Sequence, residues 1–91
     1  MDVQCEWDEK KARSNVAKHA ITFAEAATIF LDPFLITFPD DFHSDIEERF
    51  ISIGRSERQR ILLVVHTDRG TAIRIISARK ATAKERMTYE Q

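Results

Sequence analysis

Apolar residues in the first third of the chain recur at the spacing of helices. Asp8 can cap a helix that runs to about Lys18, whose many charged residues place it on the surface over a small apolar stripe. Thr22 and Glu25 match a capping box, and the apolar positions that follow predict a second helix with a buried face. Pro33 ends this helix, because the residue before a proline is displaced from the α region.

Strand patterns dominate the remainder of the chain. Strands are expected at residues 3–7, 34–38, 49–54, 60–67 and 71–77, the first of them a short strand at a sheet edge. Five consecutive branched apolar residues in the fourth of these favour a central strand covered on both faces. Gly70 suits the tight turn that follows that strand. A capping box at Thr82 and Glu85 predicts a last helix through about Glu90.

These elements together predict the fold class. Hairpin-length connections between the strands indicate a mostly antiparallel sheet of four to five strands. Two N-terminal helices and one C-terminal helix must then cover at least one face of that sheet to close a core. The sequence therefore predicts an α+β fold, with residues 1–91 forming a single domain.

Composition narrows the setting in which the chain works. The longest apolar run has five residues, far fewer than the roughly 20 that span a bilayer, so no membrane association is expected. The first residues lack the basic and apolar regions of a signal peptide. Cys5 is the single cysteine, which excludes an intramolecular disulfide and is typical of a reducing compartment. We therefore expect a cytoplasmic protein.

Charge is divided unevenly along the chain. Residues 1–48 hold four Lys and Arg against eleven Asp and Glu, whereas residues 49–91 hold ten against four. The formal net charge of −1 conceals this division. A cationic half suggests a face that binds an anion, most commonly phosphate, although a solvated surface would give the same pattern.

The acidic segment at residues 40–45 is the candidate for a metal site. It combines three aspartates with His43, and carboxylates with an imidazole can bind a divalent ion. Its spacing fits neither an EF-hand nor a helical pair of zinc-binding histidines. We expect a solvated acidic loop over residues 42–48, in which Ser44 could cap one helical turn, and neither a metal nor another cofactor.

Several motifs in this chain occur together in one known family. They begin at Trp7 and Asp8, end with the run of residues 74–81 and Tyr89, and cover nearly the whole chain. On these residues the chain resembles the BrnT-type toxins of type II toxin–antitoxin systems. One departure is Ala20, where the family pattern has glycine. The other matching positions are Lys11, Asn15, Lys18, His19, Phe23, Ala26, Asp32, Pro33, His43, Ser44, Glu48, Arg49, Phe50, Gly54, Glu85 and Arg86.

The resemblance implies a fold, an activity and partners. BrnT-type toxins have a RelE-like fold and act as endoribonucleases that arrest translation. The expected substrate is RNA. The expected partner is a BrnA-like antitoxin with a ribbon-helix-helix domain, through which the toxin would contact operator DNA indirectly.

Cleavage of RNA without a metal sets clear requirements for a site. The 2′-hydroxyl attacks the neighbouring phosphorus, so the protein must remove its proton, stabilise charge on the phosphoryl oxygens and protonate the leaving 5′-oxygen. Arginine suits the second requirement, because its planar guanidinium stays charged and can bind two oxygens at once.

The second half of the chain supplies candidates for these steps. Arg74 and Arg79 are expected to clamp the phosphate, with support from Lys80. Either His66 or Glu85 is expected to act as the base. The expected RNA-binding residues are Arg69, Arg86, Tyr89, Lys18 and His19.

Each candidate also has a structural alternative. Glu85 completes a capping box, Tyr89 could pack against the sheet, and His19 could cap the end of its helix. Strand alternation separates Arg74 and Arg79 onto different faces unless a bulge intervenes. Two other functions also fit the sequence: a non-catalytic module that binds protein or nucleic acid in an autoregulatory complex, and a degenerate toxin that binds its antitoxin without cleaving RNA.

Overall fold

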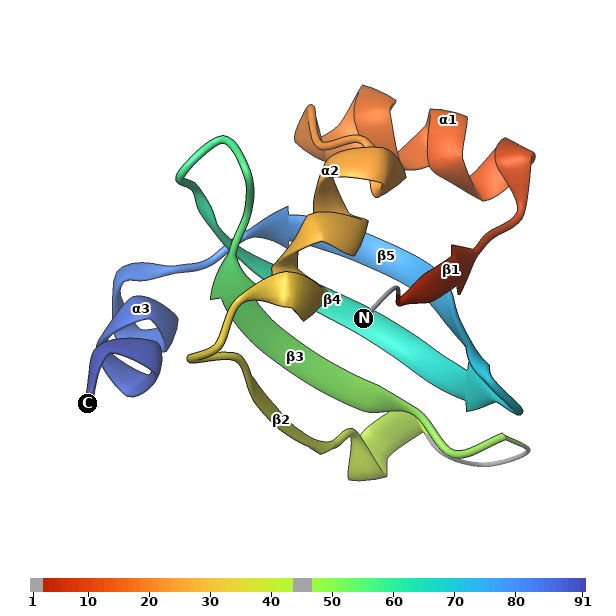
Figure 1. Cartoon of the computed structure of the whole chain (residues 1–91). Coiled ribbons are helices and arrows are strands. Elements are labelled where there is room, and N and C mark those ends of the chain that lie inside the picture. Colours follow the sequence, from red (N-terminus) through yellow and green to blue (C-terminus); the bar gives the residue numbers. More distant parts are fainter. Residues whose placement is uncertain (1–2, 44–46) are drawn as a thin grey trace.

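The computed structural model describes residues 3–43 and 47–91 and arranges them around one five-stranded sheet (Figure 1). The strands lie in the order β1-β5-β4-β3-β2. They are β1 (Gln4–Glu6), β2 (Ile36–Pro39), β3 (Phe50–Arg55), β4 (Ile61–Arg69) and β5 (Ala72–Lys80). The helices are α1 (Glu9–His19), α2 (Phe23–Ala27) and α3 (Ala83–Glu90), and the 3₁₀ turns are η1 (Thr28–Leu31) and η2 (Asp41–His43). This arrangement confirms the α+β class.

Side-chain caps begin all three helices, as the sequence predicts. Asp8 accepts a hydrogen bond from the backbone N–H two residues later at 3.3 Å. The hydroxyl of Thr22 accepts one from the N–H of Glu25 at 3.0 Å. At α3 the capping box is complete, with bonds of 3.2 Å to the Thr82 hydroxyl and 2.9 Å to the Glu85 carboxylate. None of the described helices is long and apolar enough to span a membrane.

The second helix departs from the prediction, because its α-helical part has five residues and the chain continues as the 3₁₀ turn η1. The hydroxyl of Thr28 bonds to the carbonyl of Glu25 at 2.7 Å and accepts the N–H of Glu57 at 2.9 Å. These bonds tie the helix end to the turn between β3 and β4. The Glu25 carboxylate also serves this turn, since it binds Arg60.

Strand β2 begins two residues later than expected, at Ile36. Asp32 holds the preceding residues in a turn, because its carboxylate accepts the N–H of Phe34 at 2.9 Å and its carbonyl accepts the N–H of Leu35 at 3.1 Å. Phe34 is therefore 74% exposed instead of lying in a strand. After β2 the acidic segment forms η2, while Ser44, the predicted cap of a further turn, lies outside the described residues.

The sheet is mixed, whereas hairpin-length connections predicted a mostly antiparallel one: three of its four strand pairings are antiparallel and one is parallel. β2, β3, β4 and β5 pair antiparallel, but β1 lies parallel to β5, with Gln4 opposite Ala72. No hairpin joins β1 to β5, so the length of local connections could not reveal their relative direction. β5 also extends three residues further than predicted, and Arg79 and Lys80 therefore belong to the strand instead of the connection before α3.

A bulge in β5 changes which of its side chains share a face. The register between β4 and β5 shifts at Ile76, which has no partner in β4. Ile75 and Ala78, on either side of this shift, consequently lie in the same buried cluster. Arg74 and Arg79 adjoin these two residues in the chain, so both face the opposite side of the sheet.

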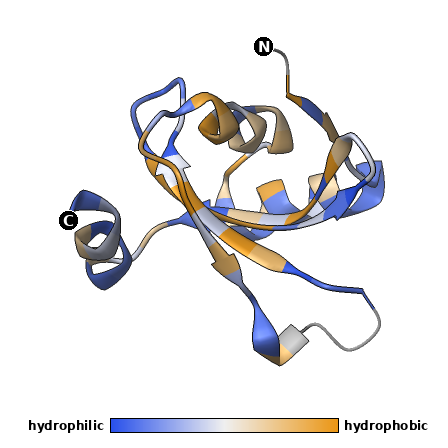
Figure 2. Cartoon of the chain, turned by 60° about the horizontal axis from the view of Figure 1, so that its bottom comes forward, coloured by the Kyte–Doolittle hydropathy of each residue, from blue (hydrophilic) through white to orange (hydrophobic). Residues whose placement is uncertain are grey.

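Apolar clusters lie on both faces of the sheet. The larger one packs between the sheet and the first two helices, and Figure 2 shows hydrophobic residues along the central strands. Its buried members are Ile21, Phe23, Ala26, Ile29, Leu62, Val64, Ile75 and Ala78. The smaller one, formed by Ile53, Leu63 and Tyr89, lies on the other face near α3. β4 contributes to both clusters, as expected for a central strand.

Asn15 fastens α1 to the edge of β5 that the short strand β1 leaves uncovered. Its side-chain amide donates to the carbonyls of Ala78 and Ile21 at 2.8 and 2.9 Å, and its oxygen accepts the N–H of Ala78 at 3.0 Å. The buried side chain thus replaces the backbone of a neighbouring strand. This attachment holds the end of α1 beside the bulge.

Candidate active site

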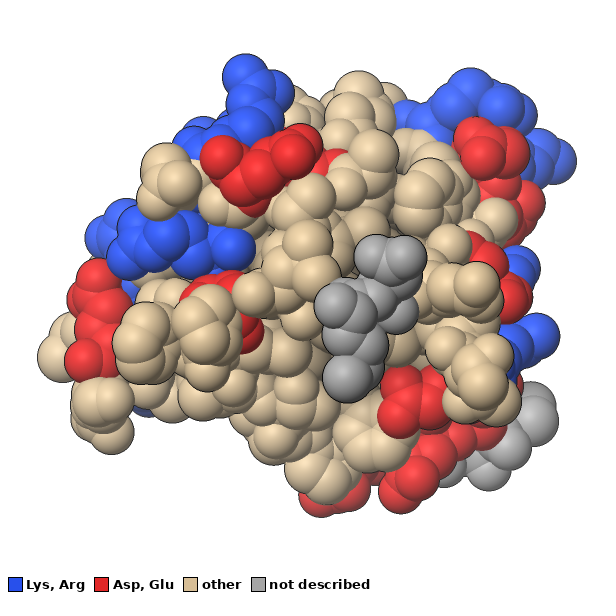
Figure 3. All heavy atoms as spheres, in the orientation of Figure 1, with Lys and Arg blue, Asp and Glu red and all other residues tan. Residues whose placement is uncertain are grey.

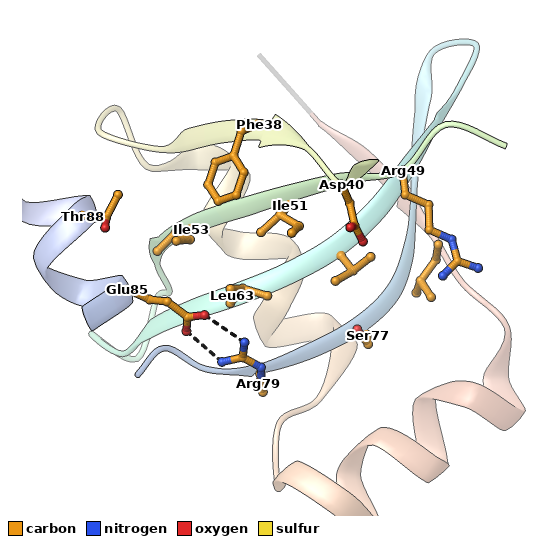
Figure 4. A pocket seen from close by; sticks show the side chains of 12 residues that line it. Phe38, Asp40, Arg49, Ile51, Ile53, Leu63, Ser77, Arg79, Glu85 and Thr88 are labelled. Carbon is orange, nitrogen blue, oxygen red and sulfur yellow. Dashed lines mark hydrogen bonds and ion pairs between the residues drawn. The ribbon is translucent and has the colours of Figure 1, made fainter. Parts of the chain in front are cut away.

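A hollow of about 440 Å³ opens on the face of the sheet that lies opposite α1 and α2 (Figure 4). Apolar residues of β3 and β4 form its floor, Phe38 of the edge strand stands at one side, and α3 borders another. This site is termed the sheet-face hollow. Its lining residues are Phe38, Asp40, Arg49, Ile51, Ile53, Leu63, Val65, Ile76, Ser77, Arg79, Glu85 and Thr88.

Arg79 and Glu85 form a bidentate ion pair in this hollow. Nη1 of Arg79 donates to Oε1 of Glu85 at 2.8 Å, and Nη2 donates to Oε2 at 2.9 Å. The same Oε1 accepts the N–H of Thr82 at the start of α3. The backbone of α3 therefore fixes the carboxylate, and the carboxylate fixes the guanidinium.

The ion pair determines the charge state of both partners. Hydrogen bonding to Arg79 lowers the pKa of Glu85 to about 2, although burial of the carboxylate acts in the opposite direction. Glu85 in turn raises the pKa of Arg79. A carboxylate with so low a pKa accepts a proton poorly near neutral pH, so Glu85 suits the positioning of Arg79 and not the expected role of base.

Part of the Arg79 guanidinium remains available. Of its five N–H donors, two bind Glu85 and one binds the carbonyl of Lys80 at 3.2 Å. The Nε–H and one Nη2–H have no acceptor among the described residues. These two donors form a second fork, whose spacing matches two oxygens of a phosphate. Arg79 can thus bind a phosphate while Glu85 holds its orientation.

His66 lies on the other face of β4, which corrects its placement as a base in the site. It is 3% exposed beneath the helices, with its ring against Phe30 and stacked on Phe50. Its Nε2 shares a hydrogen bond of 2.7 Å with the Ser52 hydroxyl. Burial lowers the pKa of His66, although Asp68 acts in the opposite direction from 3.7 Å away. An unbroken apolar run cannot show which face of a strand the helices cover.

Arg74 and Arg69 are engaged at the far end of β5. Arg74 donates to Glu6 of β1 at 2.9 Å, and Arg69 pairs with Glu47 at 3.2 Å. Arg74 and Arg79 are five positions apart in the chain, which corresponds to roughly 16 Å along a strand. The structure therefore does not bring Arg74 and Arg79 around one phosphate.

Lys80 and Arg86 line a different hollow, of about 480 Å³, at the end of the sheet. Lys80 follows Arg79 in β5, so its side chain points to the opposite side of the strand. This site is termed the strand-end hollow, and it is also lined by Arg55, Gln59, Arg60, Ile61, Ala81 and Glu90. The predicted convergence of three cations on one phosphate is thus wrong, because only Arg79 of the three faces the sheet-face hollow.

Tyr89 packs against the sheet, which was the structural alternative to its expected role in RNA binding. Its hydroxyl donates to the Asp32 carboxylate at 2.5 Å, and its buried ring belongs to the cluster near α3. Burial and the hydrogen bond to Asp32 both raise the pKa of this hydroxyl. These contacts leave Tyr89 outside the described lining of the sheet-face hollow.

Lys18 and His19 lie close to the sheet-face hollow from the side of α1. With Lys11 they line a third, smaller hollow of about 220 Å³ between the end of α1 and β5. Ile76 and Ser77, at the bulge, line both this hollow and the sheet-face hollow. The two hollows therefore adjoin across the edge of β5.

Phe38, Asp40 and Arg49 line the sheet-face hollow although they were not predicted as residues of the RNA-cleaving site. Phe38 and Asp40 enter because β2 pairs with β3, and the N–H of Asp40 donates to the carbonyl of Arg49 at 2.8 Å. Arg49 was among the positions that match the family pattern, and Asp40 was considered only as part of a metal site, whereas Phe38 was expected only as part of a strand. Within residues 3–43 and 47–91, no group of three or more His, Cys, Asp or Glu is placed to hold a metal ion.

The chain is similar to known ribonuclease toxins. Residues 7–85 match the family model described as the ribonuclease toxin BrnT of type II toxin–antitoxin systems. The fold is similar to the 1.1 Å crystal structure of the ribonuclease toxin BrnT from Brucella abortus, with a TM-score of 0.69 and 28% sequence identity. The similarity covers 89% of this chain and 99% of that one. No curated protein sequence matches the chain.

Proposed function

The chain belongs to the BrnT family of ribonuclease toxins of type II toxin–antitoxin systems, and on this premise we propose that it is a metal-independent endoribonuclease that cuts RNA at the sheet-face hollow. The observation that carries the proposal is the Arg79–Glu85 pair, which leaves a guanidinium fork unused beside a hollow large enough for a nucleotide. In this proposal residues 1–91 act as one domain with a RelE-like fold in the cytoplasm, where the toxin arrests translation.

Arg79 holds the scissile phosphate. Its Nε and Nη2 donors bind two non-bridging oxygens and stabilise the negative charge that develops as the 2′-oxygen attacks phosphorus. The bond from phosphorus to the 2′-oxygen forms while the bond to the 5′-oxygen breaks and that oxygen takes up a proton from solvent, which leaves a 2′,3′-cyclic phosphate and a 5′-hydroxyl. Glu85 keeps the guanidinium in place throughout.

His19 is the proposed base for the 2′-hydroxyl. It is exposed at the end of α1, and its hollow adjoins the sheet-face hollow at Ser77. A neutral imidazole nitrogen can accept a proton from a hydroxyl, whereas a carboxylate held by arginine is a poor base. Lys18, in the same hollow, would bind a flanking phosphate.

Phe38 is the proposed platform for a base of the substrate. Its ring is partly exposed and borders the sheet-face hollow opposite Arg79 (Figure 4). Stacking of a base on an aromatic ring stabilises single-stranded RNA binding by about 1–3 kcal/mol and tolerates different sequences.

The proposed partner is a BrnA-like ribbon-helix-helix antitoxin, through which the toxin contacts operator DNA only indirectly. The edge strand β2 supports this proposal, because its outer side pairs with no other strand among the described residues and lies between Phe34 and Phe42, which are 74% and 91% exposed. Asp41 and Glu48 are exposed nearby, and Figure 3 displays acidic residues beside η2. An extended segment with apolar and basic side chains suits such an edge.

Cleavage of RNA in EDTA tests this function. The protein should produce fragments that end in a 2′,3′-cyclic phosphate, and Arg79→Lys should lower the rate about 100-fold, because lysine keeps the charge but loses the fork. Arg13→Lys, on the exposed face of α1, is the matched control and should cleave like the unmodified protein. Intact RNA would favour the non-catalytic binding module instead. An Arg79→Lys variant as active as the control would contradict the role proposed for Arg79.

A further inference from the structure

The strand-end hollow is a strongly cationic site that the proposed cleavage chemistry does not use. It lies between the turn joining β3 to β4 and helix α3. Figure 3 shows Lys and Arg side chains on this side of the molecule. Its charged lining consists of one carboxylate, Glu90, and four cations, Arg55, Arg60, Lys80 and Arg86.

The cations of this hollow are not equally neutralised. Arg60 is bound by the Glu25 carboxylate through Nε at 2.9 Å and through Nη2. In contrast, the ammonium of Lys80 and the guanidinium of Arg86 are exposed and have no hydrogen-bond or ion-pair partner in the described part of the chain. The hollow therefore presents at least two unpaired positive charges on adjacent elements.

A hollow lined by one sign of charge concentrates ions of the opposite sign. Lys80 on β5 and Arg86 on α3 are long side chains that can each bind a separate phosphate oxygen. Because the site is wide and exposed, it suits the repeated phosphates of a nucleic-acid backbone better than a single enclosed anion.

The position of the strand-end hollow relative to Arg79 indicates which nucleic acid it binds. Arg79 and Lys80 are consecutive in β5, so the sheet-face hollow and the strand-end hollow lie on opposite sides of the end of one strand. We propose that the strand-end hollow binds backbone phosphates of the same RNA molecule, next to the phosphate held by Arg79. This inference rests on the proposed function, which identifies the scissile phosphate as the one that Arg79 holds. It places the neighbouring nucleotides of the RNA around the end of β5.

Removal of the two unpaired charges tests the inference. The variant Lys80→Gln with Arg86→Gln is compared with Lys10→Gln with Arg13→Gln, which removes the same charge from the exposed face of α1. The probe is a single-stranded 2′-O-methyl RNA of about 20 nucleotides, long enough to contact several phosphates. It lacks the attacking hydroxyl, so binding is measured whether or not the protein cleaves RNA.

The double variant Lys80→Gln with Arg86→Gln should raise the Kd for this RNA about tenfold at low salt. The slope of log K against log salt should become less negative by about 1.4, because each phosphate contact on a single strand contributes about 0.7. The single variants should each give about half of this change, and circular dichroism checks that all variants fold. A slope equal to that of the α1 control would overturn the inference, as would a loss of affinity confined to the protein partner. Failure of the proposed function would appear separately, as uncut RNA in EDTA.

Discussion

At the scale of single residues, Glu85 explains how Arg79 can serve a phosphate. The carboxylate offsets part of the guanidinium charge, but two bonds to it and a third to a backbone carbonyl fix the orientation of the side chain. A fixed fork loses less conformational entropy when a phosphate binds than a mobile one does. In the proposed mechanism Arg79 is therefore a positioned phosphate-binding group, and the two side chains do not act as a general acid–base pair.

Acid should weaken the native state through Glu85. Its pKa of about 2 in the folded protein lies below the ordinary value of 4.5, so its contribution to the free energy of unfolding is present above about pH 4.5 and is lost as the pH falls through about 2. Glu85→Gln retains an oxygen for the capping bond but cannot titrate. Urea unfolding between about pH 2 and 6 should show a smaller pH dependence for Glu85→Gln. Identical profiles would contradict the strength of the ion pair.

His66 should weaken the native state in a different pH range. Burial lowers its pKa from 6.5, so its contribution to the free energy of unfolding is complete above that value and is lost as the pH falls through the lowered one. Its Nδ1 is buried without a hydrogen bond among the described residues, so a proton there finds no good acceptor. His66→Gln should reduce the loss of stability between about pH 7 and 5, measured by urea unfolding. An unchanged loss in the variant would show that other groups cause it.

At the scale of elements, the junction between α1 and α2 carries local strain. Ala20 closes α1 with φ at 58°, in the left-handed region, where the family pattern has glycine. Ala20→Gly should raise the free energy of unfolding by about 1 kcal/mol, because glycine has no Cβ to clash there. Ala17→Gly, within α1, is the control and should lower it by about 1 kcal/mol. Chemical denaturation measures both, and a destabilised Ala20→Gly would contradict this assignment of strain.

Local signals in the sequence predict most of these elements. Asp8, Thr22 and Thr82 identify the helix starts, because a cap depends on residues that are neighbours in the chain. The parallel pairing of β1 with β5 could not be predicted in this way, because it joins segments about seventy residues apart. The bulge at Ile76 also has no local sequence signal, since it depends on the register with β4.

The candidate site could be predicted only in part for the same reason. Arg79 and Glu85 lie six residues apart, so the motif that joins β5 to α3 indicates their proximity. The remaining placements could not be predicted in this way. The position of Arg74 depends on the bulge, that of Lys80 on the length of β5, and that of His66 on which face of β4 the helices cover. These features are decided by packing across the sheet and not by neighbouring residues.

At the scale of the whole molecule, the surfaces proposed for RNA and for the antitoxin meet at the sheet-face hollow. The three hollows surround the second half of β5, whereas three exposed phenylalanines, Phe34, Phe38 and Phe42, lie along or beside β2. Phe38 belongs to both proposed surfaces, because it lies on β2 and also lines the sheet-face hollow. An antitoxin segment added to the edge of β2 would border the place where RNA binds, which gives neutralisation a direct physical cause.

The apolar edge provides a test of antitoxin binding. Phe34→Ser with Phe42→Ser should weaken the complex with the antitoxin at least tenfold, since exposed aromatic anchors contribute most of the binding energy at such surfaces. Met87→Ser removes an apolar side chain of α3 that is also largely exposed, and it should leave the affinity unchanged. Isothermal titration with the antitoxin distinguishes these cases. Equal affinities for both variants would exclude β2 as the docking edge.

The identity of the nucleophile is the most direct test of the central claim, that the protein cuts RNA by positioning a phosphate for attack by its own neighbouring 2′-hydroxyl. An RNA oligonucleotide that carries a single 2′-deoxy substitution on the 5′ side of the mapped cleavage position is incubated with the protein in EDTA. The account predicts that cleavage at this position disappears while cleavage at other positions persists. Continued cleavage of the deoxy position, or products that carry a 5′-phosphate, would contradict it.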